Sequence, residues 1–437
     1  MFRPLPHRFP RLDHRGLSRR EFLRRSLAVS GVVATGPLLW SCGSSSAPGS
    51  SPGGTVLAPS LTKLGALREA DANGIMLPEG FSSRVVAESG LPIVSDLIGG
   101  ILGPVLGYSW HTFPDGGATF AADDGGWVYV SNSESVPGGV GALRFNAAGE
   151  RVDAYRLLSG TTLNCAGGPT PWGTWLSCEE KTNGRVHECF PFGSAGDAQA
   201  RPALGTFDHE AVAVDPQRRQ LLLTEDTDDA RFYRFVPSTT DWPAGAVRPA
   251  LQDGVLQVMV VPGVADSRDI PLDSPPLAVQ WLDALNPDQP QSQNRIAETT
   301  VFAGSEGIWY VDGIVYFTCK SGNRVWAYDA ERQTIELIYD DDAHGGDAAP
   351  LRGVDNCVVY GPTRDLVVAE DGGDMRIAAI APDGTVAPIL QIVGQDNSEI
   401  TGPAFSPDGT RLYFSSQRGG RLAGGITYEV SGPFQAP

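Results

Sequence analysis

A recurring unit, in which short apolar strands alternate with turns of Pro, Asp and Gly, most constrains the fold of this chain. The unit is clearest in residues 210–237, 307–329, 354–384 and 401–432. Each stretch has an apolar strand, a turn, a second strand, and an acidic or polar corner. Units of roughly 40–50 residues that each form a small antiparallel sheet are typical of a β-propeller. We therefore predict an all-β protein, a β-propeller of about six blades.

Composition agrees with this architecture. The 53 Gly and 34 Pro among 437 residues favour many tight turns over long helices. A two-sheet sandwich or a pair of small barrels is the competing architecture, but the even spacing of the units disfavours both. In a propeller, the ends of the inner strands meet at one end of a central channel. We therefore expect the recurring acidic corners to gather at that end.

The N-terminal 42 residues have the pattern of an export signal. Ser18-Arg19-Arg20-Glu21-Phe22-Leu23 is a twin-arginine pattern. The apolar run Leu27–Trp40 is too short to span a bilayer and is typical of a signal peptide. Leu39-Trp40-Ser41-Cys42-Gly43 resembles a lipobox, in which Cys42 would be lipidated; plain cleavage by signal peptidase is the alternative.

This pattern divides the chain into three parts. Residues 1–42 are the predicted signal peptide, 43–79 a flexible tether and lead-in, and 80–437 a single propeller domain. We expect the twin-arginine translocase as a partner during export and a periplasmic or cell-surface location. A lipid on Cys42 would be the protein's only attachment to the membrane.

Charge narrows the classes of ligand. The formal net charge of −18 argues against nucleic acid, which requires a basic face. An acidic surplus suits carboxylates that surround cations. Hard cations such as Ca²⁺ take 6–8 oxygen ligands, and Fe³⁺ also favours carboxylates.

The residues that could carry chemistry are mainly carboxylates, many of them beside a glycine or a second acid. For any single pair, a solvated acidic rim is the simpler explanation. For the set, whose members end strands at equivalent places, we expect metal ligation. They are Glu134, Glu179-Glu180, His209-Glu210, Glu225-Asp226, Glu306-Gly307, Asp355-Asn356 and Glu370-Asp371.

Five cysteines follow Cys42. Cys165 precedes Ala-Gly-Gly, in an irregular segment where a thiolate could reach a metal. Cys178 and Cys189 are a candidate disulfide pair. Cys319 and Cys357 have the surroundings of buried strand residues.

Residues 164–180, Asn-Cys-Ala-Gly-Gly-Pro-Thr-Pro-Trp-Gly-Thr-Trp-Leu-Ser-Cys-Glu-Glu, closely resemble the hallmark of the PhoX-type alkaline phosphatase family. That family consists of twin-arginine-exported β-propellers, and the resemblance spans roughly residues 80–420. Further matches are Asp208-His209-Glu210-Ala211, Glu306-Gly307, Asp355-Asn356, Ala369-Glu370-Asp371-Gly372 and residues 402–409.

The resemblance implies hydrolysis of phosphomonoesters by a cluster of two Fe³⁺ and Ca²⁺ ions. It makes Cys165 the thiolate ligand of iron, and Glu179 is an alternative to Glu180 because one residue of misalignment exchanges them. Asn164 is expected on the substrate side. The metal ligands implied are Cys165, Glu179 or Glu180, Glu210, Asp226, Glu306 and Asp355.

Two departures from the family pattern bear on activity. The family has Arg-Pro before the glutamate matched to Glu306, whereas this chain has Gly304-Ser305. Its C-terminal Gln-His-Pro-Gly reads Gln417-Arg418-Gly419-Gly420, so Arg418 becomes the candidate for the phosphate-binding cation. With Asn164 and Glu306 it completes the predicted catalytic set.

Two other functions fit the same sequence. One is a calcium-dependent propeller hydrolase of the lactonase type, and the other is a non-catalytic surface propeller that binds a ligand. Cys165 favours the phosphatase over both, because a thiolate suits iron and is a poor ligand for calcium.

Overall fold

The structure is a computed structural model that describes residues 59–93, 108–421 and 424–435. The predicted signal peptide, the lipobox with Cys42 and the tether up to residue 58 lie outside the described residues. Within those ranges, no helix has the length and apolar character of a transmembrane span.

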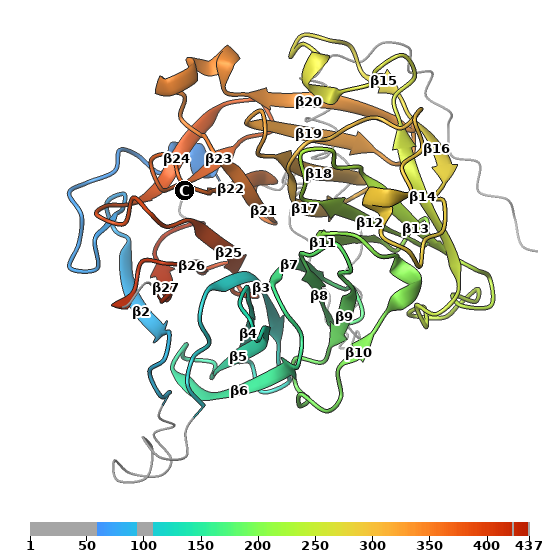
Figure 1. Cartoon of the computed structure of the whole chain (residues 1–437). Coiled ribbons are helices and arrows are strands. Elements are labelled where there is room, and N and C mark those ends of the chain that lie inside the picture. The colour runs from blue at the N-terminus through green and yellow to red at the C-terminus, as the bar shows by residue number, and fades with distance from the viewer. Residues whose placement is uncertain (1–58, 94–107, 422–423, 436–437) are drawn as a thin grey trace, which may run out of the picture.

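Six antiparallel sheets surround a central axis, so the prediction of an all-β, six-bladed propeller is confirmed (Figure 1). Blades 1 to 3 are formed, from the axis outward, by the following strands. Blade 1 consists of β3 (Pro114–Ala121), β4 (Trp127–Ser133), β5 (Gly139–Phe145) and β6 (Arg151–Ser159). Blade 2 consists of β7 (Asn164–Pro169), β8 (Trp175–Glu179), β9 (Val186–Cys189) and β10 (Gln199–Ala200). Blade 3 consists of β11 (His209–Asp215), β12 (Gln220–Glu225), β13 (Tyr233–Pro237), β14 (Gly254–Val260) and β16 (Gln280–Asp283).

Blades 4 to 6 follow the same order, and each receives a strand from an earlier part of the chain. Blade 4 consists of β17 (Ser305–Val311), β18 (Ile314–Cys319), β19 (Arg324–Asp329), β20 (Thr334–Asp340) and β15 (Leu277–Ala278). Blade 5 consists of β21 (Val354–Tyr360), β22 (Asp365–Glu370), β23 (Arg376–Ile380), β24 (Val386–Ile392) and β1 (Ile75–Met76). Blade 6 consists of β25 (Ile400–Phe405), β26 (Arg411–Ser416), β27 (Ile426–Ser431) and β2 (Ser82–Glu88).

Short 3₁₀ helices are the only helices among the described residues. They are η1 (Leu61–Lys63), η2 (Pro202–Leu204), η3 (Ser267–Asp269), η4 (Gln291–Gln293), η5 (Asp342–His344) and η6 (Gly346–Ala348).

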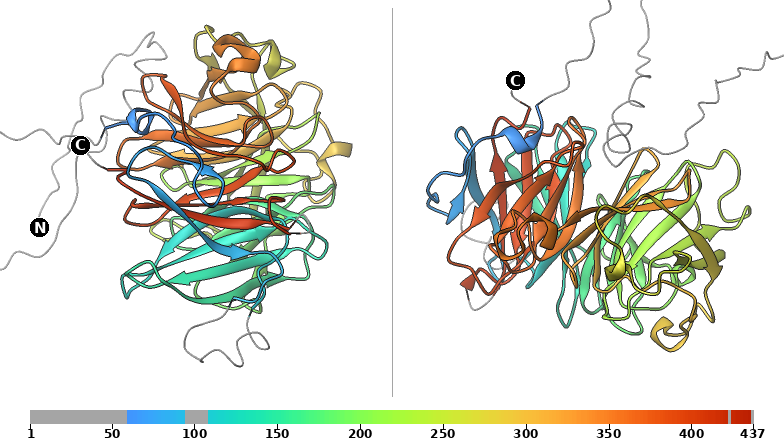
Figure 2. Two further views of the ribbon diagram at one scale, coloured as in Figure 1. Left: turned by 90° about the vertical axis from the view of Figure 1, so that its left-hand side faces the viewer. Right: turned by 90° about the horizontal axis from the view of Figure 1, so that it is seen from above.

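The N-terminal strand β2 closes the ring by pairing with β27, as the side views show (Figure 2). The segment before it differs from the expected lead-in. Leu61 and Ile75 are buried in the core, the backbone N–H of Leu61 donates to Asp365 at 2.6 Å, and β1 extends blade 5. Residues 59–79 are therefore part of the folded propeller and not a tether.

The core lies between adjacent blades. A middle strand such as β12 or β18 is buried on both faces, because neighbouring sheets cover it from two sides. Such a strand carries continuous apolar runs, for example Leu221–Leu223. The expectation of a Cys178–Cys189 disulfide is wrong: both thiols are free, and the two residues lie at different positions of the β8–β9 register.

Candidate metal centre

A β-bulge recurs in the innermost strand of every blade and positions the side chains at the axis. In blade 2, Asn164 pairs with Glu179, and the register then shifts before Gly167. In blade 3, His209 pairs with Glu225, and the same shift follows. The bulge places two residues of the inner strand opposite one residue of its partner, which re-aims the residue after the first pair.

Two rings of side chains follow from this register. The residue after the first pair of the innermost strand defines the deep ring, and the residue after the end of the second strand defines the mouth ring. The deep ring is Asp115, Cys165, Glu210, Glu306, Asp355 and Thr401, in blade order; in blade 6 Thr401 still pairs with Ser415, and the shift follows it. The mouth ring is Glu134, Glu180, Asp226, Lys320, Asp371 and Gln417.

The rings differ in exposure. The carboxylates of the deep ring are buried, whereas Glu134, Glu180, Asp226, Lys320 and Asp371 are half-buried. The site is therefore reached from solvent through the mouth ring.

Small residues close the channel beneath the deep ring. Gly116, Ala166, Ala211 and Gly307 each follow a deep-ring residue and allow the inner strands to approach closely. A Cβ on Gly116 would lie 2.5 Å from the Cα of Ala166. These residues line a cavity of only about 30 Å³, so little space remains between the inner strands below the deep ring.

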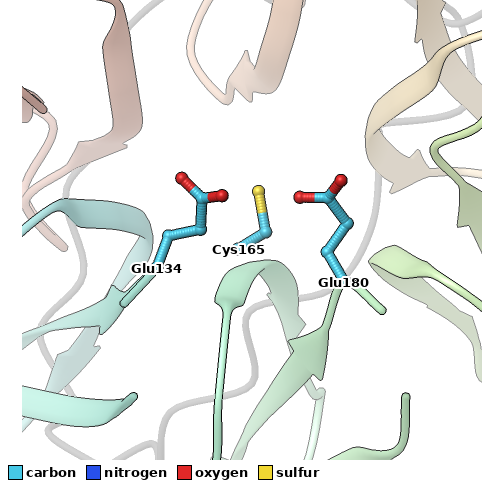
Figure 3. Close-up of side chains that lie close together, drawn as sticks. All are labelled: Glu134, Cys165 and Glu180. Atoms are coloured by element: carbon cyan, nitrogen blue, oxygen red, sulfur yellow. The ribbon is translucent and has the colours of Figure 1, made fainter. Parts of the chain in front are cut away.

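Donor atoms from the two rings and Glu399 form groups that could hold metal ions. In each group the atoms lie within 4.8 Å of one another. Figure 3 shows one of them, in which Glu134, Cys165 and Glu180 converge from blades 1 and 2. The groups are Glu134–Cys165–Glu180, Asp115–Glu134–Glu399, Glu210–Glu306–Asp355 and Asp355–Asp371–Glu399.

Glu210 is a buried carboxylate without hydrogen-bond donors among the described residues. Its side chain is fully buried, and within the described structure neither carboxylate oxygen has a hydrogen-bond partner. Burial, followed by the charges of Glu306, Glu180, Asp355 and Asp115, raises its pKa well above the usual range. A buried carboxylate without donors is costly unless a proton or a cation neutralises it.

The neighbouring carboxylates show the same perturbation. Burial is the largest cause in each case, and the surrounding acids add to it. The pKa of Glu180 rises to about 8, that of Glu399 to about 8, and that of Asp355 to about 7. The site holds protons tightly in the absence of cations, which is the behaviour of a site built for positive charge.

Burial and the adjacent acids also raise the pKa of the Cys165 thiol. The thiol is protonated in this acidic surrounding, and a metal would displace its proton.

The deep ring is held rigidly through its backbone. Asn132 of blade 1 donates to the carbonyl oxygen of Cys165 at 3.0 Å. Thr224 of blade 3 donates to that of Glu306 at 2.6 Å, and Thr318 of blade 4 to that of Asp355 at 2.6 Å. Each of these contacts comes from the preceding blade, so the positions of the ligand atoms depend on the packing of the whole propeller.

Two cations lie among the acids. Lys320 Nζ is 2.7 Å from a Glu306 oxygen and 3.1 Å from an Asp371 oxygen. Arg418 Nη1 is 2.5 Å from a Glu399 oxygen, and its Nη2 is 3.7 Å from Glu134. Arg418 is also two-fifths exposed, so its guanidinium is accessible from the mouth of the channel.

Most of the predicted ligands lie in this site. Cys165, Glu180, Glu210, Glu306 and Asp355 belong to the groups of close donors. Asp226 occupies the mouth ring, but its oxygen lies 3.9 Å from Lys320 and it joins none of those groups.

Glu179 does not lie in the site. It ends β8 and turns into its own blade, where it accepts hydrogen bonds from the backbone of Thr162 and from Lys181. Burial acts against its charge, but His187, Lys181 and Thr162 together lower its pKa to about 2. Of the two adjacent glutamates, only Glu180 lies beside Cys165.

Asn164, predicted on the substrate side, is also turned into the blade. Its Oδ1 accepts from Thr161 at 2.6 Å and its Nδ2 donates to Ser177 at 3.0 Å. Both ends of its amide contact residues of blade 2 and its side chain is buried, so Asn164 does not face the channel.

Sequence reasoning missed Asp115, Glu399, Lys320 and Gln417. Gln417 donates to Asp115 and, at 2.9 Å, to Glu134, which ties blade 6 to blade 1. A signal for Asp115 was present, since Asp115-Gly116 repeats the pattern of Cys165-Ala166 and its counterparts, a ligand followed by a small residue.

The backbone conformation of Gly304 favours glycine over the arginine of the family pattern. Its φ is +58°, and a Cβ there would lie 2.8 Å from Ser321 Oγ. An arginine at this position would be strained in this backbone conformation.

Comparison with known proteins identifies related chains. Residues 138–199 and 184–420 match the family model described as alkaline phosphatase PhoX. No curated protein sequence matches at a significant level.

Among solved structures, PhoX of Pseudomonas fluorescens in complex with vanadate, a transition state analogue, superposes with a TM-score of 0.66 at 16% identity, covering 86% of this chain and 97% of that chain. A gluconolactonase from Xanthomonas campestris, XC5397, gives a TM-score of 0.41 at 13% identity, covering 74% and 86%. The first similarity concerns the fold, and the second is too distant to bear on function.

Proposed function

The chain belongs to the PhoX alkaline phosphatase family, and from this premise we propose that it hydrolyses phosphomonoesters at an iron and calcium cluster held by the two rings. The deep ring would supply most of the ligands. The mouth ring would form the entrance for substrate.

The imbalance of charge at the axis carries this proposal. Nine carboxylates and one thiol meet there, with two cationic side chains, Lys320 and Arg418, among them. Such a set is stable at neutral pH only if protons or multivalent cations neutralise it. The carboxylates are Asp115, Glu134, Glu180, Glu210, Asp226, Glu306, Asp355, Asp371 and Glu399.

The donor types divide between the two metals. Cys165, with Glu134 and Glu180, offers a thiolate beside carboxylates, which suits iron. Glu210, Glu306 and Asp355 offer oxygens alone, which suits calcium and also iron. When bound, the metals would supply Lewis acidity toward the phosphoryl oxygens.

Arg418 would bind the phosphate. Its guanidinium is exposed at the mouth, and its partners Glu399 and Glu134 are both candidate ligands. Cations bound to those two carboxylates would weaken their hold on the guanidinium. Arg418 could then direct its N–H groups to a substrate oxygen in a charge-assisted, bidentate contact. The P. fluorescens protein, which was solved with vanadate, suggests the same oxyanion as a probe.

Metal analysis with an absorption spectrum tests the proposal. Wild type purified after native export should contain about two irons per chain together with calcium, and should absorb visible light. Cys165→Ser should lose iron and colour while the propeller stays folded. Cys319→Ser is the control, because Cys319 is a buried free thiol at the end of β18 in blade 4 but belongs to no group of close donors.

Other results would redirect the proposal. Calcium without iron would favour a lactonase-like hydrolase or a ligand-binding propeller. Unchanged metal in Cys165→Ser would refute the role of this thiol. Hydrolysis of a phosphomonoester such as 4-nitrophenyl phosphate, lost on chelation, would complete the test.

We also propose export by the twin-arginine translocase, which carries folded proteins and would allow metal loading before export. Lys substitution of Arg19 and Arg20 should retain the protein in the cytoplasm. A lipid on Cys42 would be detected as a mass increase that Cys42→Ala removes.

A further inference from the structure

Lys320 is the only cation among the twelve positions of the two rings. It follows Cys319, the last residue of β18, at the position where the other blades carry a carboxylate or an amide. Its backbone N–H donates to the carbonyl oxygen of Gly304 at 2.7 Å, so the base of the side chain is fixed.

Three carboxylates from three blades surround the Lys320 ammonium. Nζ lies 2.7 Å from Glu306, 3.1 Å from Asp371 and 3.9 Å from Asp226. A lysine side chain is ordinarily positively charged at neutral pH, and these three carboxylates favour that form.

This arrangement matches the surroundings of a bound cation. An ammonium has three N–H donors, so it can contact three carboxylates, as a bound metal ion would, while it carries one positive charge. Two positive charges at one place repel strongly, so a metal ion and this ammonium exclude each other. Consistently, Asp226 belongs to no group of three close donors, although it lies in the mouth ring with Glu134, Glu180 and Asp371, which do.

We propose that Lys320 takes the place of one metal ion in the centre, so that Asp226, Glu306 and Asp371 remain neutralised by a covalently attached cation. The proposal rests on the proposed function in that the remaining groups hold metal. It implies that this chain binds one cation fewer than its carboxylates could support, and that this side of the site stays intact when metal is scarce.

Counting bound calcium tests the proposal. Wild type, Lys320→Met and Lys320→Arg are freed of metal with a chelator, and bound Ca²⁺ is then measured by equilibrium dialysis at pH 8. Lys320→Met should bind one Ca²⁺ per chain more than wild type. Lys320→Arg, which retains the charge, should bind the same number as wild type.

Lys181→Met is the matched control. Lys181 is as exposed as Lys320 and lies at the same distance, 2.7 Å, from a glutamate, but its partner Glu179 faces away from the channel. It should bind as many Ca²⁺ ions as wild type. Circular dichroism in the presence of Ca²⁺ establishes that each variant is folded.

The difference between variants separates this proposal from the proposed function. If wild type binds no metal and Lys320→Met binds one Ca²⁺, the metal-cluster function fails and the role of Lys320 stands. Equal calcium counts in folded Lys320→Met, Lys320→Arg and wild type would overturn the proposal. Equal counts together with loss of vanadate binding in Lys320→Met would also overturn it, and would assign Lys320 to the substrate.

Discussion

Replacing Glu210 by glutamine should change stability in opposite directions with and without metal. Its oxygens lie within 4.8 Å of those of Glu306 and Asp355 and have no hydrogen-bond donors in the described structure. At an effective dielectric constant of about 20, two unit charges at such a separation repel by about 3–4 kcal/mol. In the metal-free fold, burial and this repulsion raise the pKa of Glu210 and so favour its protonated form.

Protonation itself has a cost that can be estimated. At pH 8 the unfolded chain ionises a glutamate, so holding Glu210 protonated costs about 1.4 kcal/mol for each pH unit above about 4.3. Glutamine has no such cost, and its amide can donate to Glu306 or Asp355. We expect metal-free Glu210→Gln to be more stable than metal-free wild type by about 2 kcal/mol or more at pH 8.

With metal bound, we expect Glu210→Gln to be less stable than wild type. Glutamine is a weaker ligand, and a hundredfold loss of affinity removes about 2.7 kcal/mol of the stabilisation by bound ligand. The assay is chemical denaturation of both proteins at pH 8, once with chelator and once with saturating Ca²⁺. Iron-loaded protein gives the same comparison for the other metal.

Glu225→Gln is the control. Glu225 is also fully buried, but Arg295 donates to its two oxygens at 2.8 and 3.0 Å, and the backbone of Arg231 donates at 2.8 Å. Breaking this ion pair should cost on the order of 3 kcal/mol with or without metal. If Glu210→Gln destabilises the metal-free protein as Glu225→Gln does, Glu210 is a structural residue and the reasoning is wrong.

Three further predictions follow from the same geometry. Because the pKa values of Glu180, Glu399 and Asp355 rise to about 8, 8 and 7, the fold binds protons more tightly than the unfolded chain does. Metal-free protein should therefore lose thermal stability as pH rises from about 5 to 8, and Ca²⁺ should suppress the loss; a flat profile without metal would contradict this. Glu180→Gln should lower metal content in elemental analysis, whereas Glu179→Gln should retain it and lose about 2 kcal/mol of unfolding free energy; the reverse result would exchange their roles. Gly304→Ala should cost about 1 kcal/mol or more in denaturant unfolding, because its φ is positive and Ser321 is close; an unchanged midpoint would contradict the strain.

Much of the architecture could be predicted from the sequence, because the repeating strand and turn pattern is local. The closing of the ring could not. The pairing of β2 with β27 and of β1 with β24 joins residues more than 300 positions apart, and the local sequence of a strand does not indicate such a distant partner. For the same reason the sequence, rich in small and polar residues between 59 and 79, predicts a flexible tether and lead-in there, whereas the structure places this segment in the propeller.

The candidate site illustrates a finer limit. Successive residues of a strand face opposite sides, so a pair of adjacent acids sends one side chain into the blade and the other to the axis. Composition alone cannot say which. The register decides: Glu179, Glu225 and Glu370 end their strands and are held within their own blades, and the residue after each lies in the mouth ring.

This alternation also gives the two members of each pair different functions. The first member holds the strand end in place. Glu225 does so through Arg295, and Glu370 through the backbone N–H groups of Arg352 and Arg376. The second member lies in the mouth ring, where a cation can reach it; Lys320 already does so at Asp226 and Asp371. An acid at the first position is therefore needed for geometry, and an acid at the second for charge, so exchanging the two residues of Glu225-Asp226 would disrupt both the strand end and the site.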